Sequence, residues 1–327
     1  MILVTGGAGF IGSNVVACLN DAGRDDVVIC DRLGSGEKWR NLGKRSFADF
    51  IQPEALTSWL HGSPSLQAVI HMGAISATTV VDGDAMIQSN FSLSLRLLDH
   101  CTERGIPFLY ASSAAVYGDG EQSFVDDNAL ERVKALRPLN LYGWSKRQFD
   151  IVVADRMARG VGLPPRCTGF RFFNVFGPNE DHKGDMKSVV AKLFPAAASG
   201  ERVSLFRSHR EGVADGEQRR DFIYVEDAVS VIMWALGPHG RSGIFNVGTG
   251  QARSFCDLTR AVFAALGVPE RIDYIDMPVS LRDRYQYFTE ASLGHLRRAG
   301  YAMPFTPLEQ AVAHYVQVYL GRPDRYR

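Results

Sequence analysis

The first twelve residues, Met1-Ile2-Leu3-Val4-Thr5-Gly6-Gly7-Ala8-Gly9-Phe10-Ile11-Gly12, decide the fold. Residues 1–5 predict a short buried strand, and apolar residues at positions 15, 16 and 19 predict a helix after the glycines. Glycines let the backbone turn tightly beside phosphates, and a helix N-terminus offers free N–H groups and a positive dipole. The stretch therefore predicts a dinucleotide site, although its spacing, Gly6-x-x-Gly9-x-x-Gly12, differs from the G-x-G-x-x-G of simple dehydrogenases.

Length and composition bound the kind of protein. The chain has 327 residues, of which 46% are hydrophobic, and its formal net charge is zero. This length suggests about two domains, and the balanced charge argues against nucleic acid or an anionic membrane as main partner. The scattered cysteines form no C-x-x-C pair, so we expect free thiols and no metal site. We find no signal peptide and no apolar stretch of membrane-spanning length, so we expect a cytoplasmic protein.

A second buried strand is predicted at Val27 to Cys30, and it ends at Asp31. Asp31 lies 19 positions after Gly12, about where an acidic residue meets the adenosine ribose in this type of fold. A capping or solvated aspartate is the ordinary alternative. Arg32 and Lys38 follow closely, and cations bind a ribose 2′-phosphate well. The sequence therefore favours NADP as cofactor and leaves NAD open.

Later apolar runs continue the pattern. Leu66 to His71 and Ile106 to Ala111 predict strands, and helical spacing of apolar residues predicts a helix from Asp84 to Arg104. Strands that alternate with helices indicate an α/β protein with a parallel sheet covered on both faces. The segment Met72-Gly73-Ala74 contains small residues that let the chain run beside a cofactor. Asn90 lies next to the apolar stripe of the helix, and we expect it to face the cofactor.

Two groups of polar side chains are candidates for a catalytic site. Ser112 and Ser113 leave a predicted strand, where side chains line the ligand crevice of an open parallel sheet, although such hydroxyls often only cap the backbone. Tyr142 and Lys146 are four residues apart and therefore share a helix face. A phenol is a poor base at its ordinary pKa of about 10, and a neighbouring ammonium lowers that pKa. The pair predicts an acid/base tyrosine; a solvated helix face is the ordinary alternative.

These features together resemble the extended short-chain dehydrogenase/reductase superfamily, which contains nucleotide-sugar epimerases and dehydratases. The resemblance covers essentially the whole chain. The Gly6-x-x-Gly9-x-x-Gly12 turn looks like the superfamily's cofactor turn, and Ser113, Tyr142 and Lys146 look like its catalytic trio. Three further strings are similar to superfamily strings: Phe170 to Pro178, Arg219 to Asp227, and Phe245 to Gly250.

The resemblance implies a Rossmann-like doubly wound parallel sheet with a smaller, interleaved C-terminal substrate domain. We expect the NAD(P)-binding domain at residues 1–173 plus about 222–243, and the substrate-binding domain at about 174–221 plus 244–327. Within the second domain, the sequence predicts a loop from Gly177 to Gly184, a helix from Ser188 to Ala198 and a long polar segment from Phe206 to Gln218.

Within the superfamily, the chain most resembles the ADP-L-glycero-D-manno-heptose 6-epimerase family. The distinguishing strings are Pro107 to Ala115, Pro138 to Gly143, His182 to Met186 with Ser188 and Val189, and Arg284 to Gln286 with Phe288 and Thr289. That family inverts C6″ of ADP-heptose by transient oxidation to a ketone and re-reduction, in the synthesis of the lipopolysaccharide core. The resemblance also implies a homo-oligomer, namely a homopentamer. Three residues depart from the family pattern: Pro53, Met72 and Lys192.

The resemblance implies roles for individual residues. The implied catalytic residues are Ser113, Tyr142, Lys146 and Lys183. Lys183 enters as a second acid/base, because a group fixed on a helix is not expected to reach both positions of the C6″ hydroxyl. The implied cofactor contacts are Gly6, Gly9, Phe10, Ile11, Gly12, Asp31, Arg32, Lys38, Met72, Gly73, Ala74, Ser76, Asn90, Tyr142, Lys146, Val175 and Lys183. The implied substrate contacts are Ser113, Asn174, Asp185, Lys192, Phe206, Arg207, Ser208, His209, Arg220 and Tyr285.

Two other functions stay open from the sequence. One is an epimerase of another nucleotide sugar, such as a UDP-hexose 4-epimerase. The other is a non-catalytic regulator that senses the cofactor, which the intact serine, tyrosine and lysine disfavour. A dehydratase is also disfavoured, because Ser113-Ala114-Ala115 places no carboxyl group where dehydratases of the superfamily carry Asp-Glu.

Overall fold

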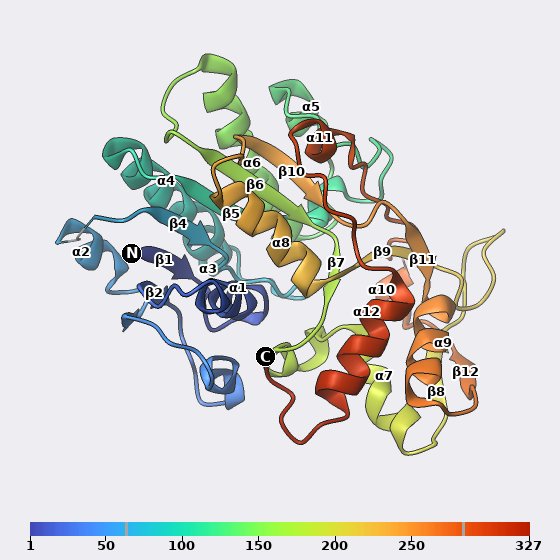
Figure 1. Ribbon diagram of the computed structural model, residues 1–327. Helices are drawn as coiled ribbons and strands as arrows, with labels where there is room; N and C mark the ends of the chain where they lie inside the picture. Colours follow the sequence, from blue (N-terminus) through green and yellow to red (C-terminus); the bar gives the residue numbers. More distant parts are fainter. Residues whose placement is uncertain (63–64, 283–284) are drawn as a thin grey trace.

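A seven-stranded parallel sheet forms the centre of the protein. The computed structural model describes residues 1–62, 65–282 and 285–327, and Figure 1 shows the strands lying side by side. All neighbouring pairs in this sheet are parallel. In spatial order the strands are β10 (Gly243–Val247), β6 (Cys167–Phe172), β5 (Phe108–Ser113), β4 (Ala68–His71), β1 (Ile2–Thr5), β2 (Val27–Cys30) and β3 (Asp49–Ile51).

Apolar side chains leave the sheet on both faces. Successive residues of a strand point to opposite sides, so Ile2 and Val4 enter one core cluster and Leu3 enters another. Helices α1 (Phe10–Asp21) and α8 (Val225–Leu236) contribute side chains to the first cluster. Helices α4 (Leu93–Arg104) and α6 (Leu141–Arg159) contribute to the second. The predicted doubly wound α/β sheet is confirmed.

A smaller part of the chain lies beside this sheet, at the lower right of Figure 1. Its three-stranded sheet pairs β9 (Arg219–Tyr224) with β7 (Asn174–Phe176) and β11 (Ala252–Ser254), and β8 (Val203–Phe206) pairs with β12 (Ile272–Ile275). Its main helices are α7 (Val189–Ala198), α9 (Phe255–Leu266) and α12 (Leu308–His314). The remaining short helical segments are η1 (Glu37–Leu42), α2 (Leu56–His61), α3 (Gly83–Met86), η2 (Ile87–Ser92), η3 (Ala114–Tyr117), α5 (Leu130–Ala135), η4 (Asp181–Met186), α10 (Val279–Arg282), α11 (Gly294–Arg298) and η5 (Tyr315–Leu320).

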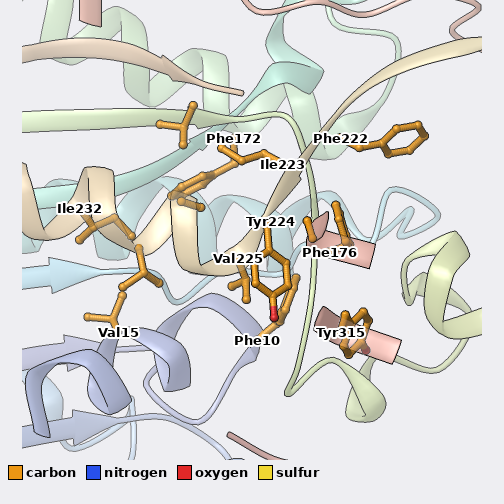
Figure 2. Packing of buried hydrophobic residues seen from close by; sticks show 14 of the residues in the cluster. Phe10, Val15, Phe172, Phe176, Phe222, Ile223, Tyr224, Val225, Ile232 and Tyr315 are labelled. Carbon is orange, nitrogen blue, oxygen red and sulfur yellow. The ribbon is translucent and has the colours of Figure 1, made fainter. Parts of the chain in front are cut away.

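The predicted boundary near residue 243 cuts through a strand of the large sheet. Strand β10 pairs with β6 along its whole length, so the large sheet continues to Val247. Residues 222–224, expected in the nucleotide-binding domain, instead belong to β9 of the smaller sheet. Figure 2 shows why the two parts are hard to separate: Val15 and Ile232 of the large part share one core cluster with Phe222 and Tyr315. The division into two domains stays a prediction.

Three predicted elements differ in detail. The helix expected from Asp84 to Arg104 is interrupted by the π-helical turn η2. The predicted loop from Gly177 to Gly184 contains the start of the 3-10 turn η4. The strand expected to end at Ala111 continues to Ser113, because β6 pairs with it to that residue. Ser113 is therefore held by strand pairing and lies where the strand becomes the turn η3.

A buried ion pair ties helix α6 to the sheet. Nε of Arg171 on β6 lies 2.9 Å from a carboxylate oxygen of Asp150 on α6, and both side chains are fully buried. Asp150 also accepts hydrogen bonds from Tyr110 and Ser112 of β5. Arg171 donates a second hydrogen bond, to the hydroxyl of Tyr117. The network fixes the helix that carries Tyr142 and Lys146 against the strand that carries Ser113.

Replacing Asp150 should therefore destabilise the protein strongly. We expect Asp150→Ala to lower the free energy of unfolding by about 3–5 kcal/mol, because Arg171 stays buried without its counter-charge. The matched control is Asp155→Ala on the same helix, which breaks an exposed pair with Arg159 and should cost at most about 1 kcal/mol. Urea unfolding followed by circular dichroism measures both. Equal losses would contradict the assigned importance of the buried pair.

Candidate active site

The glycine turn after β1 packs directly against the chain that follows β4. A Cβ added to Gly6 would lie 2.5 Å from the backbone nitrogen of Gly73, and Gly6 has a φ of +67°. A Cβ added to Gly12 would lie 2.1 Å from the Gly6 carbonyl oxygen. Helix α1 begins at Phe10 without a side-chain cap, so the N–H groups of its first turn stay available to an anion. The turn therefore fits the pyrophosphate of a dinucleotide.

Asp31 anchors this turn from the end of β2. One of its oxygens accepts a hydrogen bond from the backbone N–H of Ala8 at 2.9 Å. The other accepts from the backbone N–H of Arg32, and the ammonium of Lys38 lies 2.6 Å from it. The side chain of Arg32 is instead exposed and paired with Glu54. Asp31 and Lys38 line the same cleft, whereas Arg32 does not.

Asn90 does not face that cleft, contrary to our expectation. Its side chain is buried, with 1% exposed. The amide oxygen accepts from the backbone N–H of Ile75, and the amide nitrogen donates to the carbonyl of Ile75 and to Ser145. Asn90 thus lies beneath the segment that contains Met72, Gly73, Ala74 and Ser76 and holds it in place.

A single cleft of about 680 Å³ runs from the glycine turn to the smaller part of the protein. The four predicted catalytic residues line it together with twelve of the other predicted cofactor contacts. Those twelve are Gly6, Gly9, Phe10, Ile11, Gly12, Asp31, Lys38, Met72, Gly73, Ala74, Ser76 and Val175. Of the remaining predicted substrate contacts, the cleft is lined by Asn174, Asp185, Lys192, Arg220 and Tyr285.

Ser113 and Tyr142 meet at the start of helix α6. The helix begins there because the side chain of Asn140 caps it, accepting from the N–H of Gly143 at 2.8 Å. The Ser113 hydroxyl accepts a hydrogen bond from the N–H of Ala115. It also forms a hydrogen bond with the Tyr142 hydroxyl. Burial raises the pKa of Tyr142, and the bond with Ser113 opposes that shift. The pair presents a proton donor and acceptor to the cleft.

Lys146 lies one turn further along helix α6, on the same side as Tyr142, as their spacing predicted. That Lys146 lowers the pKa of Tyr142 stays a prediction. Its ammonium is buried and donates to the carbonyl oxygen of Ala111 at 2.8 Å. Burial lowers the pKa of Lys146 itself to about 8, and the negative charge of Asp150 opposes this. The ammonium is thus held at the end of β5, where it lines the cleft.

Lys183 reaches the cleft from another segment, the turn η4 that follows β7. Its ammonium lies 5.0 Å from the centre of the Phe10 ring, over the first residue of helix α1. Burial lowers the pKa of Lys183, and the charge of Lys192 lowers it further. A lysine whose pKa falls toward neutrality can both give and accept a proton.

Arg220 forms an aromatic-walled corner of the cleft. Its side chain is buried, with 6% exposed, and its guanidinium lies 5.1 Å from the ring of Tyr285 and 5.7 Å from that of Phe255. Nη1 of Arg220 donates to the carbonyl oxygen of Arg219 at 2.9 Å. A guanidinium that lines a cleft suits a phosphate group. Arg284, which precedes Tyr285 in the quoted family string, lies outside the described residues.

Four predicted substrate contacts do not line the cleft: Phe206, Arg207, Ser208 and His209. The ring of Phe206 packs edge-on against Tyr285 behind the cleft wall. Arg207 pairs with Asp276, and the other two donate their backbone N–H groups to Asp215 and Tyr287. The segment is bound to its neighbours in the smaller part of the protein, so these side chains do not reach the site.

The cleft also contains residues that sequence reasoning missed. His182 lines it, with Nδ1 3.1 Å from the amide nitrogen of Asn41, and burial lowers its pKa to about 4. The string around Lys183 could have identified it. Ser112, which the sequence placed with Ser113 at a strand end, also lines the cleft. The other missed lining residues are mostly apolar or small, which gives no sequence signal: Ala111, Phe172, Phe173, Phe176, Met186, Lys187, Ser188, Val189, Val190, Phe222, Phe255 and Leu258.

Among the described residues, no three His, Cys, Asp or Glu side chains are placed to hold a metal ion. Within the same ranges, no helix combines the length and the apolarity needed to cross a membrane.

Comparisons with known proteins identify the family of the chain. Residues 2–248 match the model of the NAD dependent epimerase/dehydratase family. ADP-L-glycero-D-manno-heptose-6-epimerase of Nitratidesulfovibrio vulgaris is 47% identical over 327 residues, covering 99% of each chain. The protein of the same name from Fusobacterium nucleatum is 44% identical and covers 100% of each chain.

Solved structures give the same result. The chain is similar to the crystal structure of Helicobacter pylori ADP-L-glycero-D-manno-heptose-6-epimerase, with a TM-score of 0.79 and 28% identity over 97% of this chain and 95% of that one. It is also similar to UDP-glucose 4-epimerase of Thermotoga maritima, solved with UDP-glucose, with a TM-score of 0.78, 26% identity and coverage of 97% and 98%. These findings confirm the resemblance seen in the sequence. The chain belongs to the NAD-dependent epimerase/dehydratase family and, within it, to the family of ADP-L-glycero-D-manno-heptose-6-epimerases.

Proposed function

We propose that this protein inverts C6″ of ADP-D-glycero-D-manno-heptose to give ADP-L-glycero-D-manno-heptose, with tightly held NADP as cofactor. The observation that carries the proposal is the cleft itself. It brings the glycine turn, the pair Ser113 and Tyr142, and the separate lysine Lys183 into one space of about 680 Å³. Full-length relatives at 43–47% identity support the choice of sugar.

The chain's own residues divide the chemistry between binding and proton transfer. When bound, a nicotinamide cofactor supplies reversible hydride transfer to and from a sugar carbon. Ser113 hydrogen-bonds the reacting oxygen, Tyr142 moves the hydroxyl proton, and Lys146 holds the nicotinamide ribose. Lys183 moves the proton of the hydroxyl group in the other epimer, which points in a different direction. Proton transfer needs a short hydrogen-bonding distance of about 2.6–3.2 Å. The proposal therefore assigns one group to each position of the hydroxyl.

The preference for NADP over NAD rests on Lys38. Its ammonium lies beside Asp31 at the end of β2, where the adenosine ribose binds in this type of fold. A 2′-phosphate in that place would meet Lys38, which lines the cleft, whereas Arg32 does not line it. Lys38 is therefore the cation that we assign to the phosphate.

Analysis of the products distinguishes the proposed reaction from its alternatives. Incubation with ADP-D-glycero-D-manno-heptose followed by NMR should show conversion to the C6″ epimer without added cofactor. UDP-galactose in a parallel assay tests for a UDP-hexose 4-epimerase. Turnover of the UDP-sugar alone would overturn the proposed substrate, and absence of turnover with both would favour a cofactor-sensing regulator.

The cofactor should remain bound through purification, because a redox-neutral cycle has no need to release it. Denaturing the purified protein and weighing the released nucleotide by mass spectrometry should identify NADP. Recovery of NAD alone would contradict the role assigned to Lys38. Finding no nucleotide, and no binding of added NADP⁺ or NAD⁺, would contradict the dinucleotide site.

Tyr142→Phe should fold normally and lose activity by about 10²- to 10⁴-fold, because it deletes the hydroxyl that moves the proton. Initial rates of epimerisation, with cofactor content checked, measure the loss. Ser113→Ala should cost less, since it removes a hydrogen bond and leaves the acid/base in place. A Tyr142→Phe rate within a few-fold of the wild-type rate would mean that this ring only packs.

Lys183→Met should keep the fold and the cofactor and lose epimerisation by orders of magnitude, approaching the loss in Tyr142→Phe. The physical reason is that one acid/base cannot serve both positions of the C6″ hydroxyl. Each variant is assayed from each epimer. Lys44→Met is the control, because Lys44 does not line the cleft and pairs with Asp324 at 2.7 Å. Interconversion by Lys183→Met at close to the wild-type rate would reject the two-base mechanism.

A further inference from the structure

Glu180 is a buried carboxylate that no step above uses. It follows β7, and its side chain is fully buried. One oxygen accepts from the hydroxyl of Ser188 at 2.6 Å and from the hydroxyl of Tyr315 at 3.1 Å. The other accepts from the backbone N–H of Ser188 at 2.5 Å. A carboxylate can accept all three bonds because it has only acceptor oxygens.

These bonds close the loop that carries Lys183. Glu180 immediately precedes the turn η4, and Ser188 caps the start of α7 just after it. The backbone N–H of Lys183 also donates to the carbonyl oxygen of Glu180 at 3.0 Å. Both ends of the loop are thus joined through one side chain, and Tyr315 ties the junction to the C-terminal segment η5. The position of Lys183 in the cleft depends on this closure.

The charges around Lys183 make the negative group important. From helix α7, Lys192 repels the Lys183 ammonium, and Lys183 in turn disfavours the charged form of its neighbour His182. Helix α1 contributes the uncharged ring of Phe10. Asp181 is paired with Lys187. The charge of Glu180 favours the ammonium of Lys183. Burial raises the pKa of Glu180 itself, and its bonds with Ser188 and the charge of Lys183 oppose that rise.

We propose that Glu180 is a positioning residue for Lys183. Its carboxylate closes the loop that carries the lysine and supplies the negative charge that balances the ammonium beside Lys192. The proposal deepens, and rests on, the proposed role of Lys183 in proton transfer. It predicts that the protonation of Lys183 depends on the charge of Glu180, and not merely on the shape of the loop.

The experiment measures the protonation of the Lys183 amine directly, in the full-length protein. Acetic anhydride acylates only the neutral amine, so the rate of Lys183 acetylation against pH, followed on its peptide by mass spectrometry, gives a midpoint. We expect Glu180→Gln to move this midpoint to lower pH by about one unit, because the opposite charge that favoured the ammonium is gone. The pH profile of the epimerisation rate has a limb that reports the titration of Lys183. That limb should move to lower pH as well.

Two variants separate charge from structure. Tyr315→Phe removes one hydrogen bond to the same carboxylate and keeps its charge, so its midpoint should match the wild type. Glu180→Asp shortens the side chain by one methylene group and keeps its charge. Its acetylation midpoint should therefore shift in the same direction as that of Glu180→Gln, but by less. If Glu180→Gln does not fold, the proposal is tested by comparing Glu180→Asp with Tyr315→Phe. Equal midpoints of Lys183 acetylation in these two variants would overturn it.

The outcome is independent of the catalytic role of Lys183. A folded Glu180→Gln protein whose acetylation midpoint equals that of the wild type would overturn the inference about Glu180, whatever its activity. Normal epimerisation by Lys183→Met, together with a shifted midpoint in Glu180→Gln, would instead reject the two-base mechanism and leave the Glu180–Lys183 coupling standing.

Discussion

The backbone contact between the glycine turn after β1 and the chain after β4 is the constraint on which the site depends. Gly6 and Gly73 approach so closely that a single added Cβ would collide with backbone atoms. This contact is possible because β1 and β4 are neighbours in a parallel sheet, with their carboxyl ends at one edge. Asp31 fastens the turn from β2 on the other side. The edge therefore presents backbone N–H groups where a pyrophosphate would bind.

The smaller part of the protein completes the cleft, and it does so through a shared core. Side chains of β7, β9 and η5 pack in the same cluster as those of α1 and α8. Lys183 and Arg220, which come from this part, consequently face the glycine turn across one continuous cavity. Burial then changes the chemistry of the groups that enter it: it lowers the pKa of both lysines, Lys146 and Lys183, and raises that of Tyr142.

The comparison between sequence and structure separates local patterns from long-range ones. The strand, glycine turn and helix were predictable because each pattern is set by neighbouring residues. Asn90 was placed wrongly because spacing gives the face of a helix but not the group that meets it, which is the backbone of Ile75. Arg32 was misjudged because its partner, Glu54, is distant in the sequence. The segment Phe206 to His209 matched a family pattern, yet its bonds to β12 and neighbouring loops hold it outside the cleft.

The sequence by itself determined the α/β class, the cofactor turn, the order of the catalytic motifs and the family. These depend on short-range periodicity and on residue types that have few substitutes, such as glycine where no Cβ fits. The tertiary structure decided which groups each polar side chain bonds to, and it decided the pKa shifts of the ionisable groups in the cleft. Lys146 donates a hydrogen bond to the Ala111 carbonyl, and burial lowers its own pKa to about 8. The Glu180 carboxylate is joined to Ser188, eight residues later, only because the folded loop brings the two together. Electrostatic energies depend on distance and on desolvation, and both are properties of the packed molecule.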